Sequence, residues 1–161
     1  MATTSRVRLV DSEDGRRLRV EVAGDGDWVI LAQTGTPNAG VLFEPWARDA
    51  AARGLRLVSY DRPGYGGSSP QPGRTVADCV TDVRAISRAL GFARCAVWGF
   101  SGGGPHALAC GALLGPFGLG GLVSKIPLLS TITVSNAEAL AGPAERIGLL
   151  LQQVLVFVQG L

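Results

Sequence analysis

Histidine is almost absent from this chain, since His106 is the single one among 161 residues. Cysteine is scarce as well: Cys79, Cys95 and Cys110 lie far apart in the sequence, and no two of them form a C-x-x-C pair. One histidine and three dispersed cysteines argue against a zinc site, and we expect neither a metal nor a cofactor. An odd number of cysteines in separate segments predicts reduced, partly buried thiols in a cytoplasmic protein.

Long apolar runs and an excess of one charge are also missing. The opening MATTSRVRLVDSEDGRR has no apolar signal core, which argues against export. The last stretch, IGLLLQQVLVFVQGL, is interrupted by glutamines and is shorter than the ~20 residues that cross a bilayer, so we expect no membrane anchor. Lys and Arg number 15 against 13 Asp and Glu, and they are scattered. No nucleic-acid partner is therefore implied.

What the chain does contain is enough apolar sequence for one folded domain with a real core, because 47% of it is hydrophobic and only 17% charged. The composition changes near residue 115, beyond which only Lys125, Glu138, Glu145 and Arg146 are charged. We therefore divide the chain into residues 1–114 and an atypical apolar tail, residues 115–161. The tail predicts one strand at residues 128–134 and a helix at 137–158 that is broken at Gly142 and Pro143.

Residues 1–114 alternate between strand and helix patterns. Two N-terminal segments, 6–10 and 17–23, alternate apolar and polar residues around the turn EDG, which predicts an antiparallel hairpin. Continuous apolar runs predict strands buried on both faces, at WVILAQ (28–33), LRLVSY (55–60) and CAVWG (95–99). Helical patterns cover residues 42–53, 75–91, where Thr75 and Asp78 resemble a capping box, and the segment from 103 onward. This order predicts an α/β fold with a central, mostly parallel sheet flanked by helices.

The segment VWGFSGGGPH contains the pentapeptide G-x-S-x-G, with Ser101 at its centre. It lies between the predicted strand 95–99 and the predicted helix after residue 103. A sharp strand-to-helix turn needs small flanking residues, and it leaves the serine exposed at the carboxyl end of the strand, near a helix N-terminus. The pattern therefore predicts a nucleophile elbow.

Two further segments, LAQTGTPNAG (31–40) and DRPGYGGSS (61–69), each follow a predicted strand. With these three motifs in order, the chain from about Val7 to Leu114 resembles the N-terminal half of an α/β-hydrolase-fold enzyme. The resemblance implies Ser101 as nucleophile, the backbone N–H groups of Gly102 and Thr36 as oxyanion donors, and a small ester-like substrate. Thr34 and Gly35 stand where this family usually has His-Gly. The loop that begins at Asp61 is expected to shape the site without taking part in the chemistry.

The resemblance also implies an acid and a histidine after the elbow, and the chain does not supply them in family order. His106 follows the serine by five residues on the predicted helix, and ~100° per residue turns it away from the elbow, so we expect a structural role for it. Glu138 is a weak candidate acid with no histidine to orient. The implied later strands and substrate-binding cap are missing too, and we expect a truncated or frame-altered relative of the family.

Two interpretations of function stay open. The first is a serine-type hydrolase of an ester or similar acyl bond, with little or no activity in this chain. The alternative is a non-catalytic pseudo-hydrolase that binds a ligand or partner. A third, in which another chain supplies the acid and the histidine, has no encoded interface to support it. The strand 95–99 would be an exposed sheet edge prone to self-association unless the segment 128–134 covers it.

Overall fold

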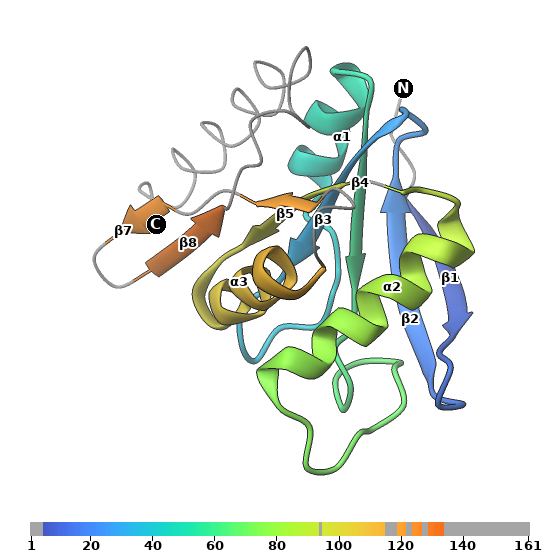
Figure 1. The fold of residues 1–161 in the computed structure, drawn as a ribbon. Coiled ribbons are helices and arrows are strands. Elements are labelled where there is room, and N and C mark those ends of the chain that lie inside the picture. Colours follow the sequence, from blue (N-terminus) through green and yellow to red (C-terminus); the bar gives the residue numbers. More distant parts are fainter. Residues whose placement is uncertain (1–4, 94, 115–118, 122–123, 127–128, 134–161) are drawn as a thin grey trace.

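The computed structural model describes residues 5–93, 95–114, 119–121, 124–126 and 129–133. These residues build one sheet with the strand order β1-β2-β4-β3-β5-β8-β7, and β6 pairs with β5 beside this path (Figure 1). The strands are β1 Arg6–Asp11, β2 Arg17–Ala23, β3 Trp28–Gln33, β4 Leu55–Tyr60, β5 Cys95–Gly99, β6 Leu119–Gly121, β7 Ser124–Ile126 and β8 Leu129–Thr133.

The central strands β4, β3 and β5 run parallel, and β1 and β2 add an antiparallel hairpin at one side. All five coincide with the segments predicted from apolar patterning, apart from one extra residue at the end of β1. Continuous apolar strands take central places because both of their faces are covered. The predicted fold class, a mostly parallel sheet flanked by helices, is confirmed.

In the described part of the chain, three α-helices flank the sheet: α1 Glu44–Ala52, α2 Cys79–Leu90 and α3 Gly104–Leu113. The predicted capping box is present, since the Asp78 carboxylate accepts from the backbone N–H and the hydroxyl of Thr75. It caps a 3₁₀ turn, Val76–Asp78, that leads into α2. Gly91 ends α2 in the left-handed region at φ 71°, where glycine carries no Cβ penalty.

The sheet separates two apolar cores. The helices α2 and α3 lie on one face of the sheet and α1 on the other (Figure 1). The first core includes Leu31 and Val58, and the second includes Ile30 and Leu57. Neighbouring residues of a strand point to opposite faces, so each central strand contributes to both cores. Val76, within the predicted helical segment 75–91, is 41% exposed, because it lies in the 3₁₀ turn ahead of α2.

Beyond α3 the described residues form short strands. The strand β6 pairs parallel with the first half of β5, and β8 pairs antiparallel with its end at Trp98 and Gly99. The far edge of β5 is therefore paired, and β8 lies within the segment expected to cover it. The expected broken helix at 137–158 lies outside the described residues. No helix in the described part of the chain is long and apolar enough to span a membrane.

Candidate active site

The elbow is a tight strand-to-helix turn with Ser101 at its apex. The strand β5 ends at Gly99, and Ser101 has φ 50°, a left-handed conformation that non-glycine residues seldom adopt. A Cβ placed on Gly99 would lie 2.5 Å from the Gly103 oxygen, and one on Gly103 would lie 2.0 Å from the Gln33 oxygen. Both flanking positions therefore require glycine, and the turn has the geometry that the G-x-S-x-G pattern predicts.

The loop after β3, residues 34–36, lies directly against this elbow. A Cβ on Gly35 would lie 3.2 Å from Cβ of Ser101, and a Cβ on Gly102 would lie 3.0 Å from the backbone nitrogen of Thr36. The fold thus brings Thr36 of the loop next to Ser101 and Gly102 of the elbow, although at least 65 positions separate Thr36 from them in the sequence. Their roles as nucleophile and oxyanion donors remain predictions.

The side chain of Arg62 forms hydrogen bonds with this loop. It is 3% exposed, and it donates to the Thr34 carbonyl oxygen, to the Gly35 carbonyl oxygen at 3.5 Å and to Oγ1 of Thr36 at 3.3 Å. In a trans peptide the C=O and N–H groups point in opposite directions. Because the Gly35 carbonyl faces Arg62, the N–H of Thr36 points away from Arg62.

Sequence patterns assigned only a general structural role to the Asp61 loop and did not single out Arg62. The predicted strand 55–60 ends directly before this loop. Since residues that follow parallel strands gather at one edge of the sheet, that position could have pointed to Arg62. Its partners at residues 34–36 follow the neighbouring strand β3. Arg62 therefore hydrogen-bonds to the segment in which Thr34 and Gly35 stand in place of the family's usual His-Gly pair.

Asp61 joins two loops and takes no visible part in the elbow. Its carboxylate accepts from the backbone N–H of Gly40 and from that of Gly67, each at 2.7 Å, and the side chain is 1% exposed. Arg19 lies 3.5 Å away as a partly exposed cation. These contacts show that Asp61 holds two loops together, and its lack of a part in the chemistry stays a prediction.

His106 packs against the elbow, as expected of a structural residue. Its Nδ1 lies 3.0 Å from the Gly102 carbonyl oxygen, which can only accept, so Nδ1 carries the hydrogen. Burial, with the charge of Arg62 as a further cause, lowers the pKa of His106, and the ring is neutral at pH 7. Nε2 is buried and has no hydrogen-bond partner in the described part of the chain. Glu138, the weak candidate acid, lies outside the described residues.

The three cysteines are free and buried. Although they are far apart in sequence, Sγ of Cys79 lies 3.8 Å from Sγ of Cys110, because α2 and α3 pack side by side. The hydrogen bond between these thiols, together with burial, raises the pKa of Cys79 far above its usual range, and burial alone does the same for Cys95. Among the described residues, no group of three or more His, Cys, Asp or Glu side chains could hold a metal ion.

An aromatic wall stands beside the serine. The rings of Trp98 and Phe100 are 5.4 Å apart, and Trp46 packs edge-on at 4.9 Å from Trp98. A Cβ on Gly35 would lie 3.1 Å from the Phe100 ring, so this ring borders the same loop that faces Ser101. Phe43 extends the wall outward and is 38% exposed.

Comparison with known proteins agrees with this geometry. The family model described as alpha/beta hydrolase fold matches residues 28–148. Epoxide hydrolase VrEH1 from Vigna radiata is similar at TM-score 0.65 and 22% identity, over 76% of this chain and 41% of its own. Epoxide hydrolase A from Mycobacterium thermoresistibile gives 0.64 and 25%, over 77% and 41%. An epoxide hydrolase from an endophytic Streptomyces gives 0.57 and 27%, over 75% and 38%.

No curated protein matches the chain. The chain spans about two-fifths of the length of the epoxide hydrolases to which it is similar, and the matched region begins at β3 and includes the elbow and the loop that faces it. The family match covers well over half of the 161 residues. On the elbow geometry, the sheet order and this match, the chain belongs to the α/β-hydrolase-fold family.

Proposed function

We propose that this chain carries the nucleophile portion of a serine-type hydrolase that acts on an ester or a similar small acyl compound. The observation that supports this most is the conformation of Ser101, at φ 50° in an elbow pressed against residues 34–36. A serine held in a strained turn is exposed to a substrate above the sheet edge. The backbone N–H groups of Gly102 and Thr36 are the proposed oxyanion donors.

In the proposed reaction, Oγ of Ser101 attacks the acyl carbon and the carbonyl oxygen becomes negatively charged. Each donor of an oxyanion hole typically supplies about 3–4 kcal/mol of transition-state stabilisation. Arg62 serves this step indirectly, since it fixes the carbonyl groups of residues 34–35 and so the direction of the Thr36 N–H. The C–O bond to the alcohol then breaks, the alcohol leaves with the proton that Ser101 gave up through solvent water, and a second water hydrolyses the acyl-enzyme to the free acid and the Ser101 hydroxyl.

The proton of Ser101 has no strong acceptor in this arrangement. Nδ1 of His106 is hydrogen-bonded to the Gly102 carbonyl oxygen, and the residue belongs to α3, the helix that follows the elbow. Loss of the histidine from a comparable serine hydrolase costs about 10⁶ in kcat. An un-ionised hydroxyl with two donors therefore supports at most slow acyl transfer, and we propose that turnover by this chain is very low.

The alternative function is a pseudo-hydrolase that keeps the pocket and binds a ligand or partner without turnover. The hydrogen bond between Nδ1 of His106 and the Gly102 carbonyl oxygen favours this alternative, because it holds the ring in a structural contact. Epoxide opening, the activity named for the similar solved structures, suits this chain less well. Displacement at an epoxide carbon needs a nucleophile that is ionised at neutral pH, whereas the hydroxyl of Ser101 is not.

The aromatic wall suggests which acyl compounds would fit. The half-buried ring of Phe100 is the next residue to the serine, and Trp98 and Trp46 pack behind it, so we propose an apolar or aromatic group on the substrate. Self-association through a sheet edge stays a prediction; within the described residues the outer strands are β1 and β7, and β5 is not one of them. The buried free thiols suit the cytoplasmic setting proposed from the sequence.

Hydrolysis of p-nitrophenyl acetate by the purified chain and by Ser101→Ala tests this proposal. We expect a slow rate above the uncatalysed background that disappears in Ser101→Ala. The matched control is Ser69→Ala, which loses one exposed hydrogen bond on another loop and should keep the rate. An undiminished rate in Ser101→Ala would contradict the nucleophile assignment. No rate in any of the three proteins would leave the pseudo-hydrolase as the function.

A further inference from the structure

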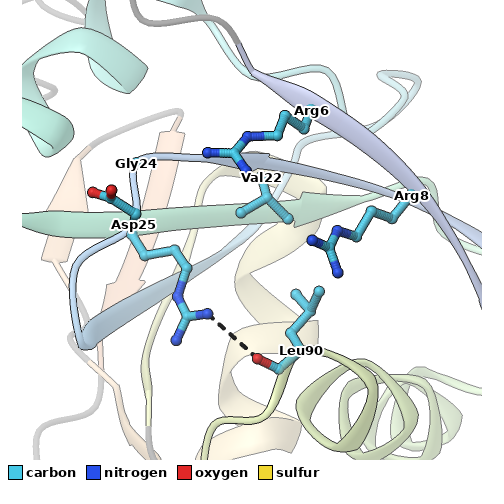
Figure 2. Close-up of a pocket in the computed structure, with 7 residues that line it drawn as sticks. Arg6, Arg8, Val22, Gly24, Asp25 and Leu90 are labelled. Atoms are coloured by element: carbon cyan, nitrogen blue, oxygen red, sulfur yellow. Dashed lines mark hydrogen bonds between the residues drawn. The ribbon is translucent and has the colours of Figure 1, made fainter.

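A second site of a different character lies at the other edge of the sheet. It is a cavity of about 150 Å³ between β1, the ends of β2 and α2, and the start of β4. Three arginines line it, Arg6, Arg8 and Arg56, with Val22 and Leu90 as its apolar part. Figure 2 shows the side chains of Arg6 and Arg8 reaching from β1 toward the space beside Val22 and Leu90.

Strand geometry explains why these arginines gather. Arg6 and Arg8 are alternate residues of β1 and so project from the same face of the sheet. Arg6 pairs with Val22, and Val22 pairs with Val58, two residues after Arg56, so all three guanidinium groups lie on the α2 face. The helix α2 ends at Leu90, which lines the cavity.

Among the described residues, the positive charge in this cavity is only partly balanced. In the described part of the chain, Arg6, Arg8 and Arg56 form no ion pair, and Asp25 is the one carboxylate among the lining residues. Arg56 donates from Nη1 to the Leu90 carbonyl oxygen at 3.3 Å, and its Nε is buried without a partner. Like charges two residues apart on one strand face, roughly 7 Å, repel each other.

We propose that this cavity binds the phosphate group of a small phosphorylated molecule. Three guanidinium groups against one carboxylate leave two positive charges unbalanced, which a phosphate monoester dianion would neutralise. Arginine forks match phosphate oxygens in geometry, and Arg6 and Arg8 are both exposed to an incoming ligand. Val22 and Leu90 are half-buried and would contact the organic part of the ligand.

The site is separate from the proposed acyl-transfer site. Arg56 is the second residue of β4, whereas Asp61 and Ser101 follow the carboxyl ends of the parallel strands β4 and β5. Strands of this length span about 17–20 Å, so nearly the whole sheet lies between the two sites. The phosphate proposal therefore does not depend on the function of Ser101.

Calorimetric titration of the full chain with phenyl phosphate, at low ionic strength, tests the proposal. The variant is Arg6→Gln/Arg8→Gln, two exposed side chains whose loss should leave the fold intact. The control is Arg48→Gln/Arg84→Gln, which removes the same charge from exposed positions on α1 and α2. A third protein, Ser101→Ala, should bind as the original chain does.

We expect binding with Kd of about 1 mM or tighter, and at least about tenfold weaker binding in Arg6→Gln/Arg8→Gln. Added salt should weaken binding, and inorganic phosphate, which lacks the apolar group, should bind less tightly. Two results would overturn the proposal. One is no heat of binding with the original chain, and the other is an equal loss in the pocket and control variants, which would indicate only general charge attraction.

Discussion

The substitution Asp61→Asn removes one charge with almost no change in shape, and it tests whether this residue joins the loops around the site. In the native protein both carboxylate oxygens are used, by the N–H groups of Gly40 and Gly67 at 2.7 Å each. An asparagine amide has a single acceptor oxygen. Whichever way the amide turns, its NH₂ group faces one of these two backbone donors.

The magnitude follows from these two contacts. One hydrogen bond changes from charge-assisted to neutral, and the other is replaced by a contact between two donors in a buried setting. Together these should lower the free energy of unfolding by about 2–4 kcal/mol. For a chain of this size each kcal/mol corresponds to about 2–4 °C in Tm, so a drop of roughly 5–15 °C is expected.

Urea unfolding followed by the fluorescence of the three tryptophans would measure this loss. The control is Asp11→Asn, because Asp11 is 85% exposed and faces Arg17 at 3.6 Å, a pair that contributes little. A loss at Asp61 below about 1 kcal/mol, similar to that of the control, would refute the role assigned here to the carboxylate. Gly40 and Gly67 would then be held by other contacts.

Two further predictions concern groups buried behind the elbow. Because burial lowers the pKa of His106 below its ordinary value near 6.5, the unfolded chain binds the proton more readily, and the free energy of unfolding should fall as the pH drops below that value. The free energy of unfolding of His106→Gln should depend less on pH between pH 8 and 5, and an identical dependence would contradict the burial argument. The thiols of Cys79, Cys95 and Cys110 should react slowly with Ellman's reagent in the native protein and all react after unfolding, since all three are buried away from the reagent. Rapid labelling of the native protein would show that α2 and α3 separate readily.

Much of the fold could be predicted from sequence because its signals are local. The strands β2, β3, β4 and β5 coincide with the predicted segments, since apolar alternation and apolar runs depend only on neighbouring residues. The elbow was equally accessible, because Gly99 and Gly103 must be small for reasons that the pentapeptide itself contains. Small departures, such as the start of α1 at Glu44, occur at element ends, where local signals are weakest.

The contacts that give the sites their chemistry were not predictable in this way. Scattered charges suggested no basic cluster, yet Arg6, Arg8 and Arg56 meet at one cavity once β1, β2 and β4 are paired. Likewise, Cys79 and Cys110 are 31 positions apart but neighbours in space. Both cases depend on which elements pack together, and one sequence contains no direct signal of that.

The sequence by itself determined the α/β order of elements, the serine at the strand-to-helix turn and the scarcity of partners for it, with one histidine in the whole chain. The tertiary structure decided what surrounds that serine. The loop 34–36 lies against it, Arg62 hydrogen-bonds to carbonyl groups of that loop, and His106 hydrogen-bonds to the Gly102 carbonyl oxygen. The physical reason is range. Periodicity and turn chemistry act over a few residues, whereas hydrogen bonds between loops depend on the pairing of strands far apart in sequence.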